Sequence, residues 1–258
     1  MTNIRPGGRT MEKAKRFAAL HVKGNPVLLY NAWDAGSARA IRDAGAKAIA
    51  TSSWSVAEAQ GYRDGEAIPM TLVQSVVARI ASTIDVPVTV DFEGGYDEDD
   101  RALTENVTRL LDVSVIGINF EDRVVKGNGL YAIKRQAKRI AAIRAAAKKS
   151  GIDLFINART DVFFQSDDQA KAAGEALERA EAYAAAGASG FFVPGLVDDA
   201  LIERICKGTL LPVNVMVMGG VSPNSRLAEL GVARISYGPI PYVQAMSALK
   251  DDAQKIYA

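Results

Sequence analysis

The stretch Val86-Pro-Val-Thr-Val-Asp-Phe-Glu-Gly-Gly-Tyr96 joins an apolar run to a polar end. The apolar residues 86–90 predict a buried strand. Asp91 and Glu93, two residues apart at its end, are expected to point the same way. The two glycines that follow let the backbone turn tightly and lie close to whatever binds there. This stretch therefore predicts a buried strand whose carboxyl end carries chemically active side chains. Its repetition along the chain predicts the fold.

This unit recurs, because short apolar runs alternate with alanine-rich amphipathic segments along the chain. We predict strands at 27–31, 47–51, 87–91, 114–120, 153–158, 190–193, 213–217 and 233–237. We predict helices near 34–44, 71–84, 100–112, 131–149, 169–186, 197–207, 222–230 and 240–256, and one earlier helix that includes His21. Eight strand–helix units are what a (β/α)8 TIM-type barrel of about 250 residues needs. Residues 1–258 are therefore expected to form one α/β barrel domain.

The main competing fold is an open, doubly wound parallel sheet. That fold would need a glycine-rich phosphate-binding turn after the first strand. The corresponding stretch, Asn31-Ala-Trp-Asp34, contains no glycine. The barrel is therefore the preferred prediction.

Composition narrows the class of function. A net charge of +1 gives no reason to expect a nucleic acid or a membrane surface as partner. No apolar run approaches the roughly 20 residues of a membrane span, and the first residues lack the apolar core of a signal peptide. The single cysteine, Cys206, rules out an intrachain disulfide and predicts a cytoplasmic protein. Since His21 is the only histidine, neither a histidine-based zinc site nor a Ser-His-Asp triad is expected.

Barrels of this type carry their active sites at the carboxyl ends of the strands. Asp91 and Glu93 end the third predicted strand, and Glu121 and Asp122 end the fourth. Four carboxylates on neighbouring strands would repel one another unless a cation lay among them, and oxygen ligands favour Mg2+, with Mn2+ as the alternative. Solvated loop acids are the competing interpretation.

Arg159 ends the fifth predicted strand. An arginine beside a metal site can grip a carboxylate or phosphonate through two parallel hydrogen bonds. Its alternative role is an ion pair with Asp161 or with an acid of a neighbouring strand. Ser52 and Ser53 could donate hydroxyl and backbone N–H bonds to a substrate carboxylate.

The loop Arg123-Val-Val-Lys-Gly-Asn-Gly129 follows the second acidic pair. Its glycines predict the hinges of a lid that brings Lys126 and Asn128 inward when it closes. An ordinary surface loop is the alternative.

With these residues in place, the chain resembles the isocitrate lyase/phosphoenolpyruvate mutase superfamily from about residue 26 to about residue 236. The resemblance rests on several motifs in the same order: Asn31-Ala-Trp-Asp-Ala-Gly-Ser-Ala38, Thr51-Ser52, Asp91-Phe-Glu-Gly-Gly-Tyr96, Phe120-Glu-Asp122 and Ala158-Arg-Thr-Asp161. It implies Mg2+ and a 2-oxo or 2-hydroxy acid that reacts through an enolpyruvate-like intermediate.

The resemblance also implies individual roles at the metal. Asp91 matches the direct metal ligand. Glu93, which replaces the more usual aspartate, and Glu121 match residues that hold the ion through water. Asp64 matches a loop acid near those waters.

Further roles concern the substrate. Ser52, with the backbone of Ser53 and Trp54, matches the site that binds a substrate carboxylate, and Arg159 matches the substrate-gripping arginine. Lys126 and Asn128 resemble the Lys-x-Asn lid of the phosphonomutase and phosphonopyruvate hydrolase branch, although the alignment is one residue short.

Other positions depart from the family pattern. The lyases carry a Lys-Lys-Cys-Gly-His lid whose cysteine donates a proton, and this chain has neither the cysteine nor the histidine there. Pro194 stands where the phosphonomutase and phosphonopyruvate hydrolase branch tends to place a histidine. Met218-Gly-Gly220 stands where the oxaloacetate decarboxylase branch tends to place one.

The expected function is a Mg2+-dependent lyase that cleaves a C–C bond of a small 2-oxo or 2-hydroxy (di)carboxylic acid. Two alternatives stay open. One is a phosphoenolpyruvate phosphonomutase or phosphonopyruvate hydrolase acting on a P–C bond, and the other is a non-catalytic 2-oxo acid binding protein.

The last residues of the chain predict that the protein forms a homo-oligomer. Pro239 and Pro241 follow the last strand and can direct the next helix, 243–257, away from its own barrel. That helix has an apolar face that must be buried somewhere. Because the family typically forms tetramers in which this helix packs on a neighbouring barrel, we expect a homodimer or homotetramer with this helix exchanged. The alternative is a monomer with the helix packed on its own barrel.

Overall fold

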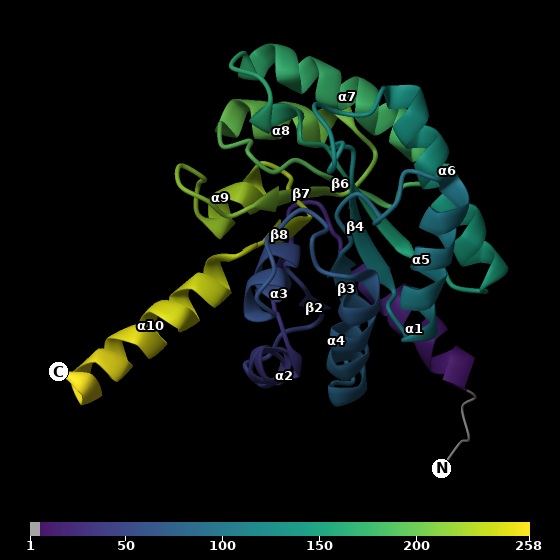
Figure 1. Ribbon diagram of the computed structural model, residues 1–258. Helices are drawn as coiled ribbons and strands as arrows, with labels where there is room; N and C mark the ends of the chain where they lie inside the picture. The colour runs from purple at the N-terminus through teal and green to yellow at the C-terminus, as the bar shows by residue number, and fades with distance from the viewer. Residues whose placement is uncertain (1–5) are drawn as a thin grey trace.

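The computed structural model describes residues 6–258. Eight parallel strands form one sheet in the order β1-β8-β7-β6-β5-β4-β3-β2. Their bounds are β1 Val27–Leu29, β2 Ile49–Ala50, β3 Val88–Asp91, β4 Gly117–Glu121, β5 Phe155–Arg159, β6 Gly190–Phe192, β7 Val213–Met216 and β8 Arg234–Ser236. The sheet closes through Ala32, whose N–H donates to the Ala50 carbonyl (2.8 Å) and whose carbonyl accepts from the Ser52 N–H (3.3 Å). The predicted TIM-type barrel is confirmed (Figure 1).

Helices surround the barrel and lie close to the predicted ranges. They are α1 Pro6–Ala19, α2 Ala35–Asp43, α3 Ser53–Ala59, α4 Met70–Thr83, α5 Asp100–Asp112, α6 Ile133–Lys149, α7 Gln169–Ala185, α8 Asp199–Gly208, α9 Asn224–Glu229 and α10 Ile240–Tyr257, with a 3-10 turn η1 at Val162–Phe164. Some details differ from the prediction, among them the turn η1, which was not predicted. The short helix α3 was not predicted, and His21 lies just beyond α1 because that helix ends at Ala19.

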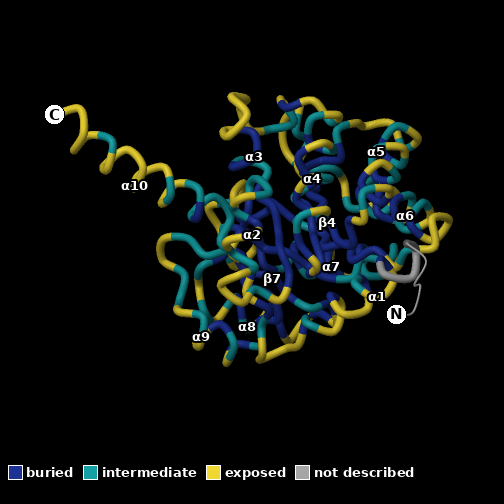
Figure 2. Tube along the Cα trace, turned by 90° about the horizontal axis from the view of Figure 1, so that it is seen from below, coloured by how far each residue is buried: buried dark blue, intermediate teal, exposed yellow. Residues whose placement is uncertain are grey.

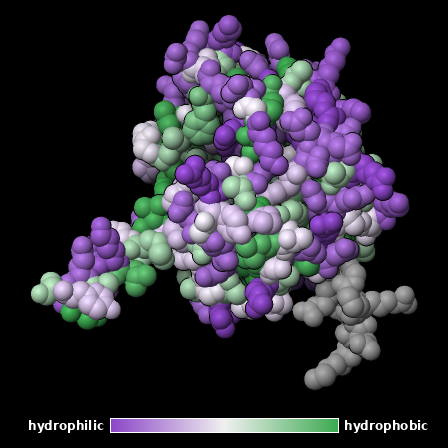
Figure 3. Space-filling model, in the orientation of Figure 1, coloured by the Kyte–Doolittle hydropathy of each residue, from purple (hydrophilic) through white to green (hydrophobic). Residues whose placement is uncertain are grey.

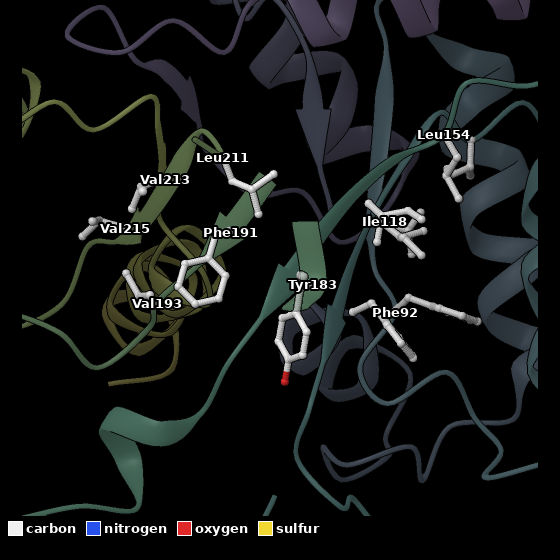
Figure 4. Close-up of a cluster of buried hydrophobic side chains, with 14 of the residues drawn as sticks. Phe92, Ile118, Leu154, Tyr183, Phe191, Val193, Leu211, Val213 and Val215 are labelled. Carbon is white, nitrogen blue, oxygen red and sulfur yellow. The ribbon is translucent and has the colours of Figure 1, made fainter. Parts of the chain in front are cut away.

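Local sequence explains where the helices start and which face they bury. Before α5, the Asp99 side chain accepts hydrogen bonds from the backbone N–H groups of Arg101 and Ala102 (both 3.0 Å), which caps the helix. Leu103 and Val107, four residues apart, then lie on one buried face. Such faces pack against the outside of the strands, and Figure 4 shows part of this shell with Ile118, Phe191 and Val213.

A second apolar cluster fills the amino-terminal end of the barrel interior. It consists of Ala14, Phe17, Val27, Leu29, Ala48, Ala50, Ile116 and Phe155. Phe17 of α1 meets the Phe155 ring edge-on at 5.3 Å, and His21 stacks on the same ring at 4.0 Å. Helix α1 therefore closes the end of the barrel opposite the predicted site.

Helix α10 leaves the barrel and projects outward (Figures 1 and 2). Pro241 is buried at its base, but Leu249 and Ile256 further along are 62% and 78% exposed. Apolar residues therefore lie along an extension that makes few contacts with its own barrel (Figure 3). None of the described helices has the length and apolar character needed to cross a membrane.

Candidate active site

The carboxyl ends of β3, β4 and β5 bring the predicted site residues together. Asp91 is the register partner of Asn119, and Glu121 is the register partner of Arg159. Register partners on parallel strands point to the same face of a sheet. The two acids and the arginine therefore share one end of the barrel.

Asp91 has one oxygen fixed and one oxygen free. Its Oδ2 accepts hydrogen bonds from the Ser53 hydroxyl (2.7 Å) and the Ser53 backbone N–H (3.2 Å) at the start of α3. Its Oδ1 is buried and has no hydrogen-bond partner among the described residues. Buried polar atoms are rarely left without a partner, so this oxygen is available to accept a hydrogen bond or to contact a cation.

Glu93 lies where the chain leaves β3 with a left-handed backbone (φ 47°). Its carboxylate is buried and accepts from the Glu66 backbone N–H (2.8 Å) and the Tyr96 hydroxyl (3.2 Å). Burial, together with the charges of Asp64 and Asp91, raises the pKa of Glu93 to about 8. A nearby cation would therefore favour its ionised form.

Glu66 was missed by the sequence analysis. Its side chain accepts from the Tyr96 backbone N–H (2.7 Å), so it holds the turn after β3 from the opposite loop. Nothing in the local pattern marks a single loop glutamate, and only the fold brings it beside Glu93.

Arg159 is held by two acids, as its alternative interpretation expected. Its Nε and Nη2 bond to the two oxygens of Asp161 (2.6 and 2.9 Å), and its Nη1 lies 3.1 Å from Oε2 of Glu121. A guanidinium has five N–H donors, so these contacts leave two for a substrate. Burial raises the pKa of Glu121 well above its ordinary value, and the Arg159 charge opposes that rise.

Asp122 does not join the acid cluster, which corrects the expectation of four carboxylates around one cation. Its Oδ2 accepts from Arg179 (3.1 Å) and Tyr183 (2.9 Å) of α7, and its Oδ1 accepts from the Asp161 backbone N–H (3.0 Å). Adjacent residues of a strand face opposite sides, so Asp122 points away from Glu121. Asp161 takes its place as the fourth buried acid of the cluster.

The serines and Trp54 lie at the start of α3. The Ser52 hydroxyl caps that helix and accepts a hydrogen bond from the Ser55 backbone N–H at 3.4 Å. The Ser53 hydroxyl instead donates to Asp91. Trp54 meets Tyr242 at 5.9 Å, and the Tyr242 ring also packs edge-on against Trp33 at 5.2 Å.

Asp64 is exposed at the rim of the site. Partial desolvation and then the charge of Asp91 raise the pKa of its carboxyl, while a hydrogen bond from the Gly65 backbone and the charges of Arg159 and Arg123 act in the opposite direction. Its carboxylate therefore interacts electrostatically with the acid cluster.

The loop predicted as a lid folds back on itself. Arg123 and Leu130 form an antiparallel bridge, and the Val124 N–H donates to the Gly129 carbonyl (3.0 Å). Asn128 is exposed at its tip, while Lys126 lines a cavity of about 180 Å3 together with Glu66 and Arg139. The loop thus lies beside the turn that follows β3.

The loop also packs closely against the turn after β3. A Cβ atom on Gly94 would lie 2.8 Å from the Val125 Cγ2 atom. Glycine is therefore needed at position 94 for this close approach.

A divalent cation fits this donor set. Among residues 6–258, no three side chains of His, Cys, Asp or Glu converge closely enough to hold an ion on their own. The unpartnered Oδ1 of Asp91 fits a single direct ligand, and the carboxylates of Glu93 and Glu121 nearby suit water-mediated contacts.

Comparisons with known proteins agree with this geometry. The phosphoenolpyruvate phosphomutase family matches residues 17–257. A provisionally assigned phosphonomutase from Burkholderia cenocepacia J2315 is 48% identical, with a TM-score of 0.92 over 94% of this chain and 99% of that chain. The 2-methylisocitrate lyase of Escherichia coli K12 is 27% identical over 250 residues, covering 94% of this chain and 82% of that protein.

One solved structure of the same fold holds a metal ion. A phosphonopyruvate hydrolase in complex with oxalate and Mg2+ is 20% identical and has a TM-score of 0.83, with coverage of 95% of this chain and 87% of that chain. The matching family is named for a mutase and the Escherichia coli relative is a lyase, which removes support for a non-catalytic binding protein. The chain therefore belongs to the phosphoenolpyruvate phosphomutase family and is an enzyme of the isocitrate lyase/phosphoenolpyruvate mutase superfamily.

Proposed function

We propose that this enzyme is a Mg2+-dependent lyase that cleaves a C–C bond of a small 2-oxo or 2-hydroxy (di)carboxylic acid. The observation that carries the proposal is the free, buried Oδ1 of Asp91 beside Glu93, Glu121 and Arg159. When bound there, Mg2+ would polarise the 2-oxo group and offset the negative charge that develops as the neighbouring bond breaks. Mn2+ would suit the same oxygen donors.

The chain's own residues orient the reactants. Ser53 holds one oxygen of Asp91, which leaves the other oriented toward the cation. Asp161 and Glu121 fix the guanidinium plane of Arg159, so its two remaining N–H groups are placed in advance for a substrate carboxylate. Ser52 would add a hydroxyl contact to the same substrate.

The lid would complete the site. Lys126 and Asn128 would move inward with the 123–130 loop, cover the developing charge and exclude water. Asp64 at the rim would hold water near the cation. These roles follow from the resemblance of the three residues to the lid and the loop acid of the family.

P–C bond chemistry is the second candidate. The lid lacks the cysteine and histidine that the lyase branch uses, and Cys206 is buried on α8. The 48% identical relative is assigned, provisionally, as a phosphonomutase. Phosphonopyruvate is therefore the substrate that tests this alternative.

A substrate screen separates the two activities. Purified enzyme with MgCl2 would be incubated with oxaloacetate, dimethylmalate, methylisocitrate and phosphonopyruvate, with EDTA and the Asp91→Ala variant as controls. Release of a 2-oxo acid from a C–C substrate, lost in both controls, supports the lyase. Rearrangement of phosphonopyruvate or phosphate release from it supports P–C chemistry, and no turnover on any of the four refutes the lyase proposal for these substrates. A cytoplasmic location stays a prediction from the single cysteine.

A further inference from the structure

Arg234 is a buried cation inside the barrel. It is 1% exposed, and its Nη2 donates to Oδ1 of Asn119 at 3.0 Å. Arg234 lies on β8 and Asn119 on β4, which are opposite strands of the barrel, so their contact crosses the interior. The Phe17 ring of α1 lies 5.9 Å away.

This arginine has few partners for its charge. Its Nε and Nη1 are buried without a hydrogen bond, and it forms no salt bridge with a described carboxylate. Arg139, which is equally buried, instead donates to two backbone carbonyls and lies against the rings of Phe120 and Tyr131. A buried charge without a partner is unfavourable, so packing alone does not account for an arginine at position 234.

Asp91 of the acid cluster is the carboxylate whose negative charge acts on Arg234. Asn119, which Arg234 contacts, is the register partner of Asp91 on the adjacent strand, so Asp91 also faces the interior. Burial lowers the pKa of Arg234 to about 9, and the charge of Asp91 opposes that effect. Arg234 therefore lies beneath the end of β3 that carries the proposed metal ligand.

The charges of the cluster show what this cation can do. The carboxylates of Asp91, Glu93, Glu121 and Asp161 carry four negative charges when ionised, and Arg159 pairs with two of them. Neither Asp91 nor Glu93 has a described salt bridge to a cation. Arg159 and Arg234 together offset two of these four charges, and the nearby carboxylate of Asp64 adds a further negative charge. The site therefore keeps a net negative charge that a divalent cation would offset.

We propose that Arg234 is an internal counterion that stabilises the acid cluster before the metal binds and limits how tightly the metal is then held. The inference rests on the proposed metal site. Without Arg234, the metal-free cluster would lose its interior cation, and the more negative site would attract a divalent cation more strongly.

The test compares Arg234→Met with Arg144→Met. Arg144 is a mostly buried arginine that donates to the Gly187 carbonyl (2.9 and 2.8 Å), far from the acid cluster. Thermal unfolding would be followed in EDTA and at saturating MgCl2, and Mg2+ binding would be measured by calorimetry. We expect Arg234→Met to lose melting temperature mainly in EDTA and to bind Mg2+ about threefold to tenfold more tightly. Arg144→Met should lose the same amount in both conditions.

Equal losses for Arg234→Met with and without Mg2+, at unchanged Mg2+ affinity, would overturn the proposal. Arg234→Lys covers the case in which the methionine variant does not fold. It keeps the charge, so its Mg2+ affinity should stay within about twofold of the unmodified protein, and a clear gain in affinity would count against the counterion. An unmodified protein whose melting temperature does not respond to Mg2+ would refute the metal site itself, and this inference with it.

Discussion

Asp91 is the residue on which the proposed chemistry depends most directly, because its two oxygens have different environments. We predict that Asp91→Ala abolishes detectable Mg2+ binding while the fold survives, since the side chain stands at a strand end outside the apolar core. The free energy of unfolding should change by less than about 2 kcal/mol. Calorimetric titration with Mg2+ tests the first part, and chemical denaturation tests the second. Asp168→Ala, which removes an exposed helix cap of α7, is the control that should bind Mg2+ normally. Unchanged binding in Asp91→Ala would remove this residue from the site.

Arg159 combines two functions that a lysine could not reproduce. Its planar fork meets Asp161 with two bonds and Glu121 with a third. We predict that Arg159→Lys lowers kcat/KM at least about 100-fold, because an ammonium group cannot hold these acids and a substrate carboxylate in one plane. Steady-state kinetics on the substrate found in the screen would measure this. A variant within about twofold of the unmodified enzyme would mean that Arg159 serves only as an ion-pair residue.

Burial of His21 should make the free energy of unfolding depend on pH. Burial, and then the charge of Arg234, lower the pKa of its imidazole to about 3, whereas the unfolded chain binds the proton near 6.5. The folded protein therefore keeps His21 neutral. The contribution of His21 to the free energy of unfolding is at its maximum above pH 6.5 and decreases as the pH falls toward 3. Each pH unit below 6.5 should lower the free energy of unfolding by about 1.4 kcal/mol relative to His21→Gln.

The measurement is chemical denaturation of both proteins at several pH values from 7.5 to about 4.5. Since both share the same carboxylates, the difference between them isolates His21. A constant difference across this range would contradict the prediction.

At the scale of single elements, much of the fold could be predicted from the sequence and part of the site could not. Apolar runs and amphipathic periods gave the eight strands and the long helices, because burial imposes those patterns directly. Helix α3 was missed because its seven residues are too few to show a period and its first serines resemble a binding loop. Asp122 was assigned to the cluster, but neighbouring side chains of a strand point to opposite faces, so Asp122 and Glu121 lie on different sides of the sheet. Glu66 joins through a contact between loops that are distant in sequence, which no local pattern records.

The lid provides a prediction at this scale. Gly94 has an ordinary backbone conformation, so Gly94→Ala should fold, but its new methyl group would press on Val125 and lift the 123–130 loop. We expect trypsin to cleave after Lys126 several-fold faster in this variant and KM to rise. The double variant Gly94→Ala/Val125→Ala removes the contact with Val125 and should restore most of both values, while the Glu66 Oε1 atom stays 3.0 Å from the new Cβ. If the single variant is cleaved at the normal rate, the loop does not depend on this contact.

At the scale of the whole molecule, the barrel is left with an uncovered face. A groove of about 920 Å3 runs along β1 and α2 and is lined by Leu28, Tyr30 and Ile41 among others. Leu28 on the outside of β1 is 47% exposed. The helix after β8 would ordinarily cover this face, but α10 points away from it (Figure 1). We propose that α10 of a second copy packs into this groove, which gives a homodimer or a dimer of dimers.

Light scattering of the full chain should therefore give an oligomeric mass at micromolar concentration, and a chain that ends at Gly238 should be monomeric. Leu249→Asp, on the apolar face of α10, should weaken assembly at least about tenfold. Ala248→Asp adds the same charge on another face of this exposed helix and serves as the control. A monomeric full chain, or a shortened chain that keeps the oligomeric mass, would refute the exchange.

The contact between Trp54 and Tyr242 has a consequence for how such an enzyme would behave on dilution. Tyr242 stands at the root of α10, and Trp54 belongs to the same short helix whose Ser53 orients Asp91. A subunit that separates from its neighbours would release the outer part of α10. Movement of α10 could then reach α3 through the Tyr242–Trp54 contact, and so change how Ser53 holds Asp91. The specific activity would then decrease as the enzyme is diluted. The amount of enzyme in a cell would therefore affect the activity of each molecule.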